Sequence, residues 1–501
     1  MKKVVSLLLC LVLAFGIAGC ANNPANNPDV TEPPEPTAAE ATKEPSSEAS
    51  SEEIVELTLA FWDMQSAEPY ATWVKQFNKA LLENNINAQI KFIDAGTDAA
   101  MLVSNGELAD ILYFQDGWIN DYEFATQGLL LDLTDYIENS TYIKAIEEAF
   151  PYQKERMKNW PYVLYFATPD IRTGLIRQDA LNACDIAEEF MQNPTIENYE
   201  ILFEQLMAQG YEMAWVNGTG DFIELNPTFD MAFGLTQTWM KQDDGSYVYC
   251  RVTEESLNQL KWYADMYKKG YLDPDLATNT WEEKENILFT GRAAINAARF
   301  GWASQYYSDS VVNQFGEGAE FIAIPPAKGV SQGYLTSVAR ETRGFAISAL
   351  TERADLCFSI FEFLASPEGR VIDLFGVEGD HYTRSEDGTI NLAEHVNNWE
   401  PTFSTALVNL DQSKINPETP YWTTAGNSAL ETYMKYAALD NDFTVPADLA
   451  VNWDAATTLW NQFAMQFVLG QKTEADWEDF VENWYAYGGK EMTEYAASVL
   501  N

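Results

Sequence analysis

The hydrophobic pattern of the first folded region alternates between strand-like and helix-like stretches. Residues 56–62 alternate and then become fully apolar, residues 86–92 alternate again, and residues 111–114 are apolar throughout. Each of these ranges predicts a β-strand. Between the first two, apolar residues recur four positions apart over residues 73–81, which predicts a helix. The order favours an α/β fold, with a parallel sheet covered by helices.

A second patterned block lies much later in the chain, at residues 342–383. Residues 344–348 form a short apolar run entered through a glycine, which predicts a buried strand, and residues 353–364 carry apolar positions on one helical face. Ser366 and Pro367 then suit the N-cap and first turn of another helix. We therefore expect strand, helix and helix in this block.

The amino-terminal residues predict a targeting segment. Lys2 and Lys3 precede a short apolar run over residues 4–18, which ends in small residues before Cys20. This pattern is typical of a secretory signal, and the run is short for a permanent membrane span. The residues before Cys20 also resemble a lipobox, so we expect a signal peptide at residues 1–19 and a lipid on Cys20. Secretion with cleavage at a nearby position is the alternative.

Residues 20–53 differ in composition from the rest of the chain. They are mostly proline, asparagine, serine, alanine and glutamate, without an aromatic residue. Such a segment buries too little apolar surface to offset its ordering entropy. We expect a solvated, semi-extended tether between the lipid and the folded protein.

Charge excludes some partners. The 76 acidic and 30 basic residues give a net charge of -46, which argues against binding to nucleic acid or, by the folded part, to anionic lipid. The acidic runs lack EF-hand spacing and are expected to be solvated helix faces rather than calcium ligands.

Cysteine and histidine provide little for catalysis or metal binding. Besides Cys10 in the signal and Cys20, the chain has Cys184, Cys250 and Cys357, widely spaced and of undetermined disulfide state. The only histidines, His381 and His395, are 14 residues apart and make a poor zinc pair by sequence. No nucleophile elbow of the GxSxG type accompanies them. We expect neither an enzyme, nor a metal, nor a cofactor.

Several stretches together resemble a known family. Residues 342–383 have the strand-helix-helix order described above, residues 110–137 read DILYFQDGWINDYEFATQGLLLDLTDYI, and residues 160–181 read WPYVLYFATPDIRTGLIRQDAL. With FTGRAAIN at residues 289–296, they resemble the family 1 extracellular solute-binding proteins, the substrate receptors of bacterial ABC importers. Gln178 stands where the family often has a basic residue, which leaves open which side chain reaches the ligand there.

The resemblance implies a two-lobed, periplasmic-binding-protein-like fold of type II. Each lobe is expected to hold a mixed, mostly parallel sheet flanked by helices, and the chain crosses the hinge several times, at about residues 339–345 and 377–384 among others. The first lobe would comprise residues 54–167 plus 344–376. The second would comprise residues 168–343 plus 377–501.

The candidate site residues follow from the strand ends and from the resemblance. In open α/β sheets, ligands lie beyond the carboxyl ends of strands, and tryptophan faces stack on sugar rings while carboxylates and amides bind the hydroxyl groups. The stacking candidates are Trp62, Trp118, Trp160, Trp215 and Trp302. The polar candidates are Asp63, Gln65, Asp116, Arg172, Arg343 and Glu378. Any single tryptophan could instead belong to a core, and Arg343 could pair with an acid at the hinge.

The resemblance implies capture rather than chemistry. We expect a monomeric, lipid-anchored receptor on the extracellular face of a cell without an outer membrane, which closes its lobes on a carbohydrate, in particular an oligosaccharide, and presents it to an ABC permease. The alternatives are a surface carbohydrate-active hydrolase, a receptor for a peptide or another polar solute, and a binding protein that reports to a membrane sensor.

Overall fold

The computed structural model describes residues 53–61, 70–94, 103–104, 108–114, 121–166, 171–299, 301–396, 399 and 402–501. The expected signal peptide, the lipidation of Cys20 and the tether before residue 53 lie outside the described residues. These expectations stay predictions.

The first sheet has the order β11-β3-β1-β2. Strand β1 (Val55–Phe61) pairs in parallel with β2 (Ala88–Asp94) and with β3 (Ile111–Phe114). The late strand β11 (Gly344–Ile347) joins β3 antiparallel. The predicted parallel sheet is confirmed, and the chain returns to complete it more than 200 residues after β3.

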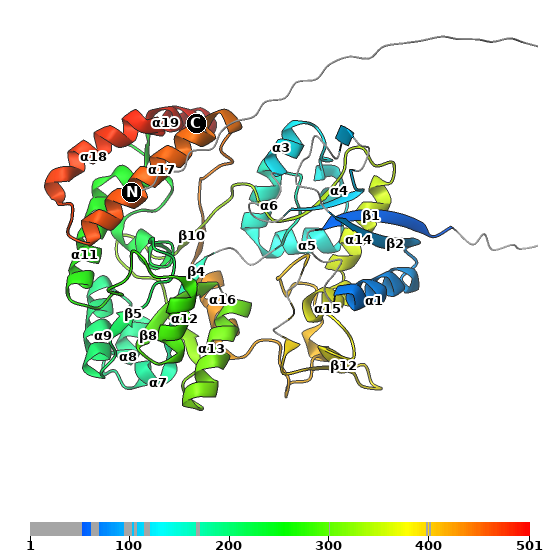
Figure 1. Cartoon of the computed structure of the whole chain (residues 1–501), viewed down its shortest axis with the longest axis horizontal. Coiled ribbons are helices and arrows are strands. Elements are labelled where there is room, and N and C mark those ends of the chain that lie inside the picture. Colours follow the sequence, from blue (N-terminus) through cyan, green and yellow to red (C-terminus); the bar gives the residue numbers. More distant parts are fainter. Residues whose placement is uncertain are drawn as a thin grey trace, which may run out of the picture. The chain divides into compact units, whose positions relative to one another are not determined.

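Two helices follow β11 as the pattern predicted. Helix α14 (Ala354–Ala365) lies beside the sheet, and Ser366 then caps α15 (Pro367–Phe375) by accepting the Gly369 N–H at 3.2 Å (Figure 1). Phe361 of α14 shares a hydrophobic core with Leu57 of β1. Helix α14 thus packs in the same core as the first sheet.

Helices from the first third of the chain cover the same sheet. They are α1 (Tyr70–Glu83), α3 (Asp121–Thr126), α4 (Thr134–Glu138), α5 (Tyr142–Ala149) and α6 (Pro151–Asn159). The helix predicted from residue 71 is α1, whose Trp73 and Phe77 are buried in that core.

The second sheet has the order β5-β8-β4-β9. Strand β4 (Arg172–Arg177) pairs antiparallel with β8 (Ala293–Arg299) and β9 (Phe321–Ala323), and only β5 (Met213–Trp215) is parallel to its neighbour β8. Among the described strands the sheet is therefore mixed, and the expectation of mostly parallel pairing holds for the first sheet alone. Short buried strands are apolar in both arrangements, so their sequence does not reveal their direction.

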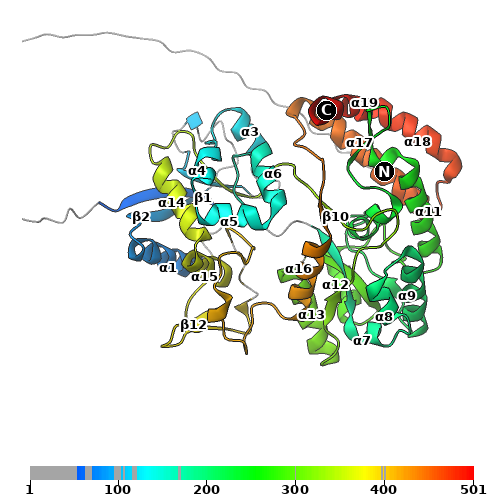
Figure 2. The ribbon, with the colours of Figure 1, turned by 180° about the vertical axis from the view of Figure 1, so that it is seen from behind.

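Further elements complete the second lobe and the segment after α15. The helices are α7 (Gln178–Asn182), α8 (Ala187–Gln192), α9 (Ile196–Ala208), α10 (Asn226–Phe229), α11 (Glu254–Lys268), α12 (Trp281–Phe289), α13 (Trp302–Phe315), α16 (Thr424–Tyr436), α17 (Ala447–Val468), α18 (Trp477–Trp484) and α19 (Lys490–Leu500). The two-stranded pairs are β6 (Trp239–Lys241) with β7 (Tyr247–Tyr249), β10 (Tyr334–Thr336) with β14 (Ala437–Leu439), and β12 (Tyr382–Arg384) with β13 (Ile390–Leu392). Figure 2 shows α17, α18 and α19 gathered next to α11. No helix in the described ranges is long and apolar enough to span a bilayer.

Core membership bears on the lobe boundaries. Val377, Trp399, Phe403 and Ala406 belong to the same hydrophobic cluster as the first-lobe strands. The boundary after residue 376 stays a prediction, although these four residues, which lie beyond it, pack in the core of the first sheet.

The crossing that precedes β11 is hydrogen-bonded to a later segment of the chain, which the sequence did not indicate. The Asp442 carboxylate accepts hydrogen bonds from the Ser337 hydroxyl and the Val338 N–H, and the Thr444 hydroxyl accepts the Arg340 N–H at 3.0 Å. Residues 437–444 thus run along the crossing that precedes β11. The crossing is restrained by a segment about one hundred residues later.

Candidate functional site

Several predicted site residues lie outside the described part of the chain. They are Trp62, Asp63, Gln65, Asp116 and Trp118. Trp302 begins α13, but its side chain is also outside the described set. These six stay predictions, and five of them follow the carboxyl ends of β1 and β3, where a ligand is expected.

Trp160 belongs to an aromatic cluster in the first lobe. Its ring stacks on Tyr122 with centroids 5.2 Å apart and planes within 4°, and it meets Tyr162 edge-on at 5.1 Å. The indole N–H donates to the Asp121 carboxylate at 3.1 Å. All three rings are only partly buried. The cluster therefore presents aromatic surface in a fixed orientation, as stacking on a ligand requires.

An ion pair contacts this aromatic cluster. Asp121 is buried and pairs with the guanidinium of Arg340, which also lies 5.6 Å from the Tyr122 ring centroid. Burial raises the pKa of Asp121, because loss of hydration disfavours the carboxylate more than Arg340 stabilises it. Sequence reasoning missed Arg340, although it lies within the predicted crossing. Only the fold shows that Asp121 is its partner.

Arg343 lies at the carboxyl edge of the first sheet. It directly precedes β11, whose Gly344 is opposite the last residue of β3, Phe114. Its Nε donates to the Tyr113 hydroxyl at 2.9 Å, and its guanidinium lies 5.2 Å from the Tyr165 ring centroid. This position is beside the end of β3, and the predicted Asp116 and Trp118 follow β3 in the sequence.

Two arginine-carboxylate pairs involve residues of the crossing, and whether Arg343 also pairs with an acid stays a prediction. Arg340 pairs with Asp121, and Arg156 of α6 contacts Glu341 at 2.7 Å. Each pair links one residue of the crossing to the first lobe.

Arg172 begins β4, opposite Arg299 at the carboxyl end of β8. Its guanidinium is 3.6 Å from the carboxylate of Glu224, which is fully buried and also binds the ammonium of Lys284 at 2.6 Å. Burial lowers the pKa of Lys284, and the charge of Glu224 offsets this only in part. Among the described atoms, Nη1 of Arg172 has no hydrogen-bond partner. Two cations thus share one carboxylate at this edge of the second sheet.

Trp215 is a core residue rather than a surface platform. Only 1% of it is exposed, and it packs against Phe203 and Phe229 with centroids 6.5 and 5.7 Å away. Its ring has no free face for a sugar, so the structure does not support the predicted stacking role. An apolar strand indicates burial but does not distinguish a core tryptophan from one at a strand end.

Glu378 lies apart from the other described candidates. Its backbone N–H donates to the Gln76 side chain of α1 at 2.8 Å, and its carboxylate is 3.8 Å from Arg384 in β12. These contacts belong to the turn after α15. In the described part of the chain, neither of these contacts of Glu378 is with Trp160, Arg343 or Arg172.

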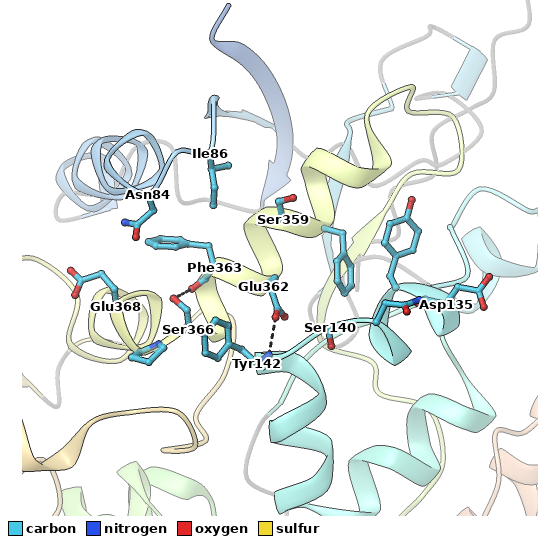
Figure 3. Close-up of a pocket in the computed structure, with 14 residues that line it drawn as sticks. Asn84, Ile86, Asp135, Ser140, Tyr142, Ser359, Glu362, Phe363, Ser366 and Glu368 are labelled. Atoms are coloured by element: carbon cyan, nitrogen blue, oxygen red, sulfur yellow. Dashed lines mark hydrogen bonds between the residues drawn. The ribbon is translucent and has the colours of Figure 1, made fainter. Parts of the chain in front are cut away.

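A groove of about 830 Å³ lies elsewhere in the first lobe. Figure 3 shows the Glu362 carboxylate beside the start of α5, where it accepts backbone N–H groups of residues 141–143. Ile86, which precedes β2, lines the groove. The groove is therefore at the amino edge of the sheet, and its central carboxylate already caps a helix. Its lining is completed by Asn84, Asp135, Tyr136, Asn139, Ser140, Tyr142, Phe358, Ser359, Phe363, Ser366, Pro367 and Glu368.

Comparison with known proteins identifies the family. The profile of the bacterial extracellular solute-binding proteins matches residues 63–371, well over half of the chain. The chain belongs to this family, whose members are binding proteins rather than enzymes.

A curated relative and solved structures agree with this assignment. The polygalacturonan/rhamnogalacturonan-binding protein YtcQ of Bacillus subtilis (strain 168) is 20% identical, over 97% of this chain and 96% of the relative. An HMO-binding, ABC-transporter-associated solute-binding protein from Bifidobacterium longum infantis is 14% identical, with a TM-score of 0.60, and covers 89% of this chain and 98% of its own. The N-glycan transport protein NgtS from Streptococcus pneumoniae has the same identity and coverage and a TM-score of 0.59. The fold is thus that of the two-lobed solute-binding proteins.

Proposed function

We propose that this protein captures an oligosaccharide outside the cell and delivers it to an ABC permease. The observation that carries the proposal is the family match over residues 63–371, together with a relative that aligns along nearly the whole chain and is named for binding polygalacturonan and rhamnogalacturonan. Two structural neighbours are also named for glycan binding or transport. The fold alone does not determine which solute is bound. The carbohydrate ligand must therefore be argued from the residues of the site.

The aromatic cluster supports a sugar ligand. Trp160 is held by Asp121 and stacked on Tyr122, so little side-chain entropy remains to be lost when a sugar ring packs on it. Arg343 and Arg172 supply charged donors for hydroxyl or carboxylate groups. Contacts on both lobes would favour the closed form by hinge motion.

Anchoring and partners are part of the same proposal. Cys20 would carry the lipid, residues 20–53 would act as the tether, and the monomeric receptor would stay on the extracellular face of the membrane. Replacing Cys20 by Ala should abolish incorporation of labelled fatty acid and release the protein to the medium. Labelling of the Cys20→Ala variant at the level of the natural chain would contradict the lipid site.

Calorimetry with a ligand panel tests the cargo. The panel contains oligogalacturonides, rhamnogalacturonan fragments, neutral oligosaccharides, monosaccharides and a peptide mixture. We expect micromolar binding of at least one oligosaccharide, about 8 kcal/mol, and unchanged chain length of that ligand after prolonged incubation. No heat with any sugar, combined with tight binding of a peptide, would contradict the carbohydrate assignment.

The role of Trp160 is tested in the same assay. Trp160→Ala should weaken oligosaccharide binding by about tenfold, because one stacked ring contributes about 1 kcal/mol or more. Tyr487→Ala is the control, since Tyr487 is 63% exposed on the C-terminal helices. Equal affinities of the two variants would remove Trp160 from the site.

A further inference from the structure

The only two histidines of the chain meet in the segment after α15. Their ring centroids are 5.5 Å apart, although 13 residues separate them in the sequence. The hairpin β12–β13 explains the meeting, because Tyr382 pairs with Leu392 and the Ala393 N–H donates to the His381 carbonyl at 2.9 Å. Spacing along the sequence was therefore a poor guide to whether these residues form a pair.

Asp380 completes a three-residue cluster. One carboxylate oxygen is 3.3 Å from Nε2 of His395, and the other is 3.9 Å from Nδ1 of His381. One ligand atom from each of the three residues lies within 4.8 Å of the others. In a tetrahedral site with metal-ligand bonds of about 2.1 Å, neighbouring ligand atoms are about 3.4 Å apart. The ligand atoms thus need to approach one another by at most about 1.4 Å to hold one ion.

The cluster is accessible on one side and anchored on the other. The side chains of Asp380 and His395 are 58% and 48% exposed, whereas that of His381 is 6% exposed and lies 5.5 Å from the Trp399 ring. An ion can therefore approach from solvent toward a ligand that the fold already holds in place. Open coordination positions would be filled by water.

One existing hydrogen bond limits the affinity. Nδ1 of His381 accepts the Val377 N–H at 3.1 Å. Ligation through this nitrogen would replace that hydrogen bond with a metal bond. The Val377 amide would then change its environment when the ion binds.

We propose that Asp380, His381 and His395 form a site for a divalent transition-metal ion of the zinc class. Imidazole nitrogen and carboxylate oxygen are ligands suited to Zn²⁺, Co²⁺ and Ni²⁺, whereas Mg²⁺ and Ca²⁺ prefer all-oxygen sites. The ion would link the turn that follows α15 to residue 395 across the hairpin. It would stabilise this segment, because a ligand that binds only the folded state shifts the unfolding equilibrium. None of the three ligands is among the residues proposed above to bind the oligosaccharide.

Zinc titration of the full chain tests the site. Calorimetry at neutral pH should show one bound Zn²⁺ for the natural protein and no heat with Mg²⁺ at the same concentrations. His395→Ala and Asp380→Asn should each weaken zinc binding at least tenfold. Asp387→Asn is the matched control, since Asp387 lies in the exposed turn of the same hairpin, and it should bind as the natural chain does. Only the natural chain and the control should gain thermal stability with zinc.

Imidazole NMR provides a readout that misfolding does not imitate. The chain has two histidines. The ring-nitrogen signals of both histidines should shift on zinc addition, together with the signal of the Val377 amide. Absence of zinc binding, or equal zinc affinity of His395→Ala and the natural chain, would overturn the proposal; in the second case the ion binds elsewhere, for example at surface carboxylates.

Discussion

Two buried ion-pair networks, one in each lobe, differ in whether they reach the protein surface. In the first lobe Arg370 pairs with Asp373 at 2.8 Å, and neither side chain has exposed surface. The Asp373 carboxylate also accepts the backbone N–H groups of residues 402–404, and Arg370 donates to the carbonyls of Ser404 and Ala406. Asp373 and Arg370 thus bind the backbone of residues 402–406 to α15.

The second-lobe network has an additional cation. Glu224 binds Lys284 and lies near Arg172, and it also accepts the Gly218 N–H at 2.9 Å. Lys284 donates in addition to the Ala297 carbonyl at 2.7 Å. The Arg172 side chain is 14% exposed, in contrast to the fully buried Lys284. The network therefore reaches the surface with positive charge that Glu224 does not balance.

The comparison separates a structural network from one with capacity for a ligand. The Arg370–Asp373 pair has no exposed surface and binds mainly backbone, although Nε of Arg370 has no hydrogen-bond partner among the described atoms. Removing one partner of such a pair leaves an uncompensated buried charge. A network with an additional arginine at its edge can keep its buried part intact while the arginine binds an incoming oxygen. Mutations can distinguish these two roles.

Asp373→Asn should have the largest effect. It leaves the fully buried Arg370 without a counter-ion and should cost about 3–5 kcal/mol of unfolding free energy. Urea denaturation followed by tryptophan fluorescence measures this, with Asp387→Asn as the exposed control. A loss below about 1 kcal/mol would show that the backbone contacts alone hold the segment.

Lys284→Met should cost somewhat less, about 2–3 kcal/mol, because Arg172 remains beside Glu224 and offsets part of its charge. Adding Glu224→Gln to this variant should recover part of the loss, since both charges are then gone. Lys79→Met, at a side chain that is 75% exposed, is the control in the same denaturation assay. If the double variant is less stable than Lys284→Met, the uncompensated charge of Glu224 is not the main cause of the stability lost in Lys284→Met.

Glu147→Gln tests a buried carboxylate for which the described residues provide no such network. Burial raises its pKa from 4.5 to about 7, and Lys154 and Lys144 offset this only in part. The pKa of Glu147 is higher in the folded state than in the unfolded state. Its stabilising contribution is therefore fully present below pH 4.5 and is lost as the pH rises through 7. The variant should therefore gain about 2 kcal/mol at pH 8 and nothing at pH 4.

Denaturation at the two pH values checks this prediction. Glu138→Gln, at an exposed position of α4, is the control. A gain that is equal at both pH values would point to packing rather than ionisation.

Arg172→Gln should have the smallest effect on stability, less than about 1 kcal/mol, since Glu224 keeps Lys284. Under the proposed function, it should nevertheless weaken oligosaccharide binding by about tenfold through loss of a charge-assisted hydrogen bond. Calorimetry and denaturation of the same preparation measure both, with Arg292→Gln as the control on a partly exposed arginine of the second lobe. Unchanged affinity would make Arg172 part of the structural network only.

The sequence alone determined the elements and their order. The apolar run at residues 111–114 is β3, the spacing from Trp73 predicted α1, and Ser366 caps α15 as its position indicated. These features depend on interactions within a few residues, so local pattern is sufficient to find them. The lobe architecture came from the family resemblance and is confirmed by the comparisons.

The tertiary structure alone decided which side chains meet. It buried Trp215 but left Trp160 partly exposed, gave Asp121 to Arg340, and brought His381 to His395. It also set the direction of β4 in the second sheet. Each of these outcomes depends on the pairing of strands and crossings that are distant along the chain, and residue type or spacing at one position carries no record of that pairing.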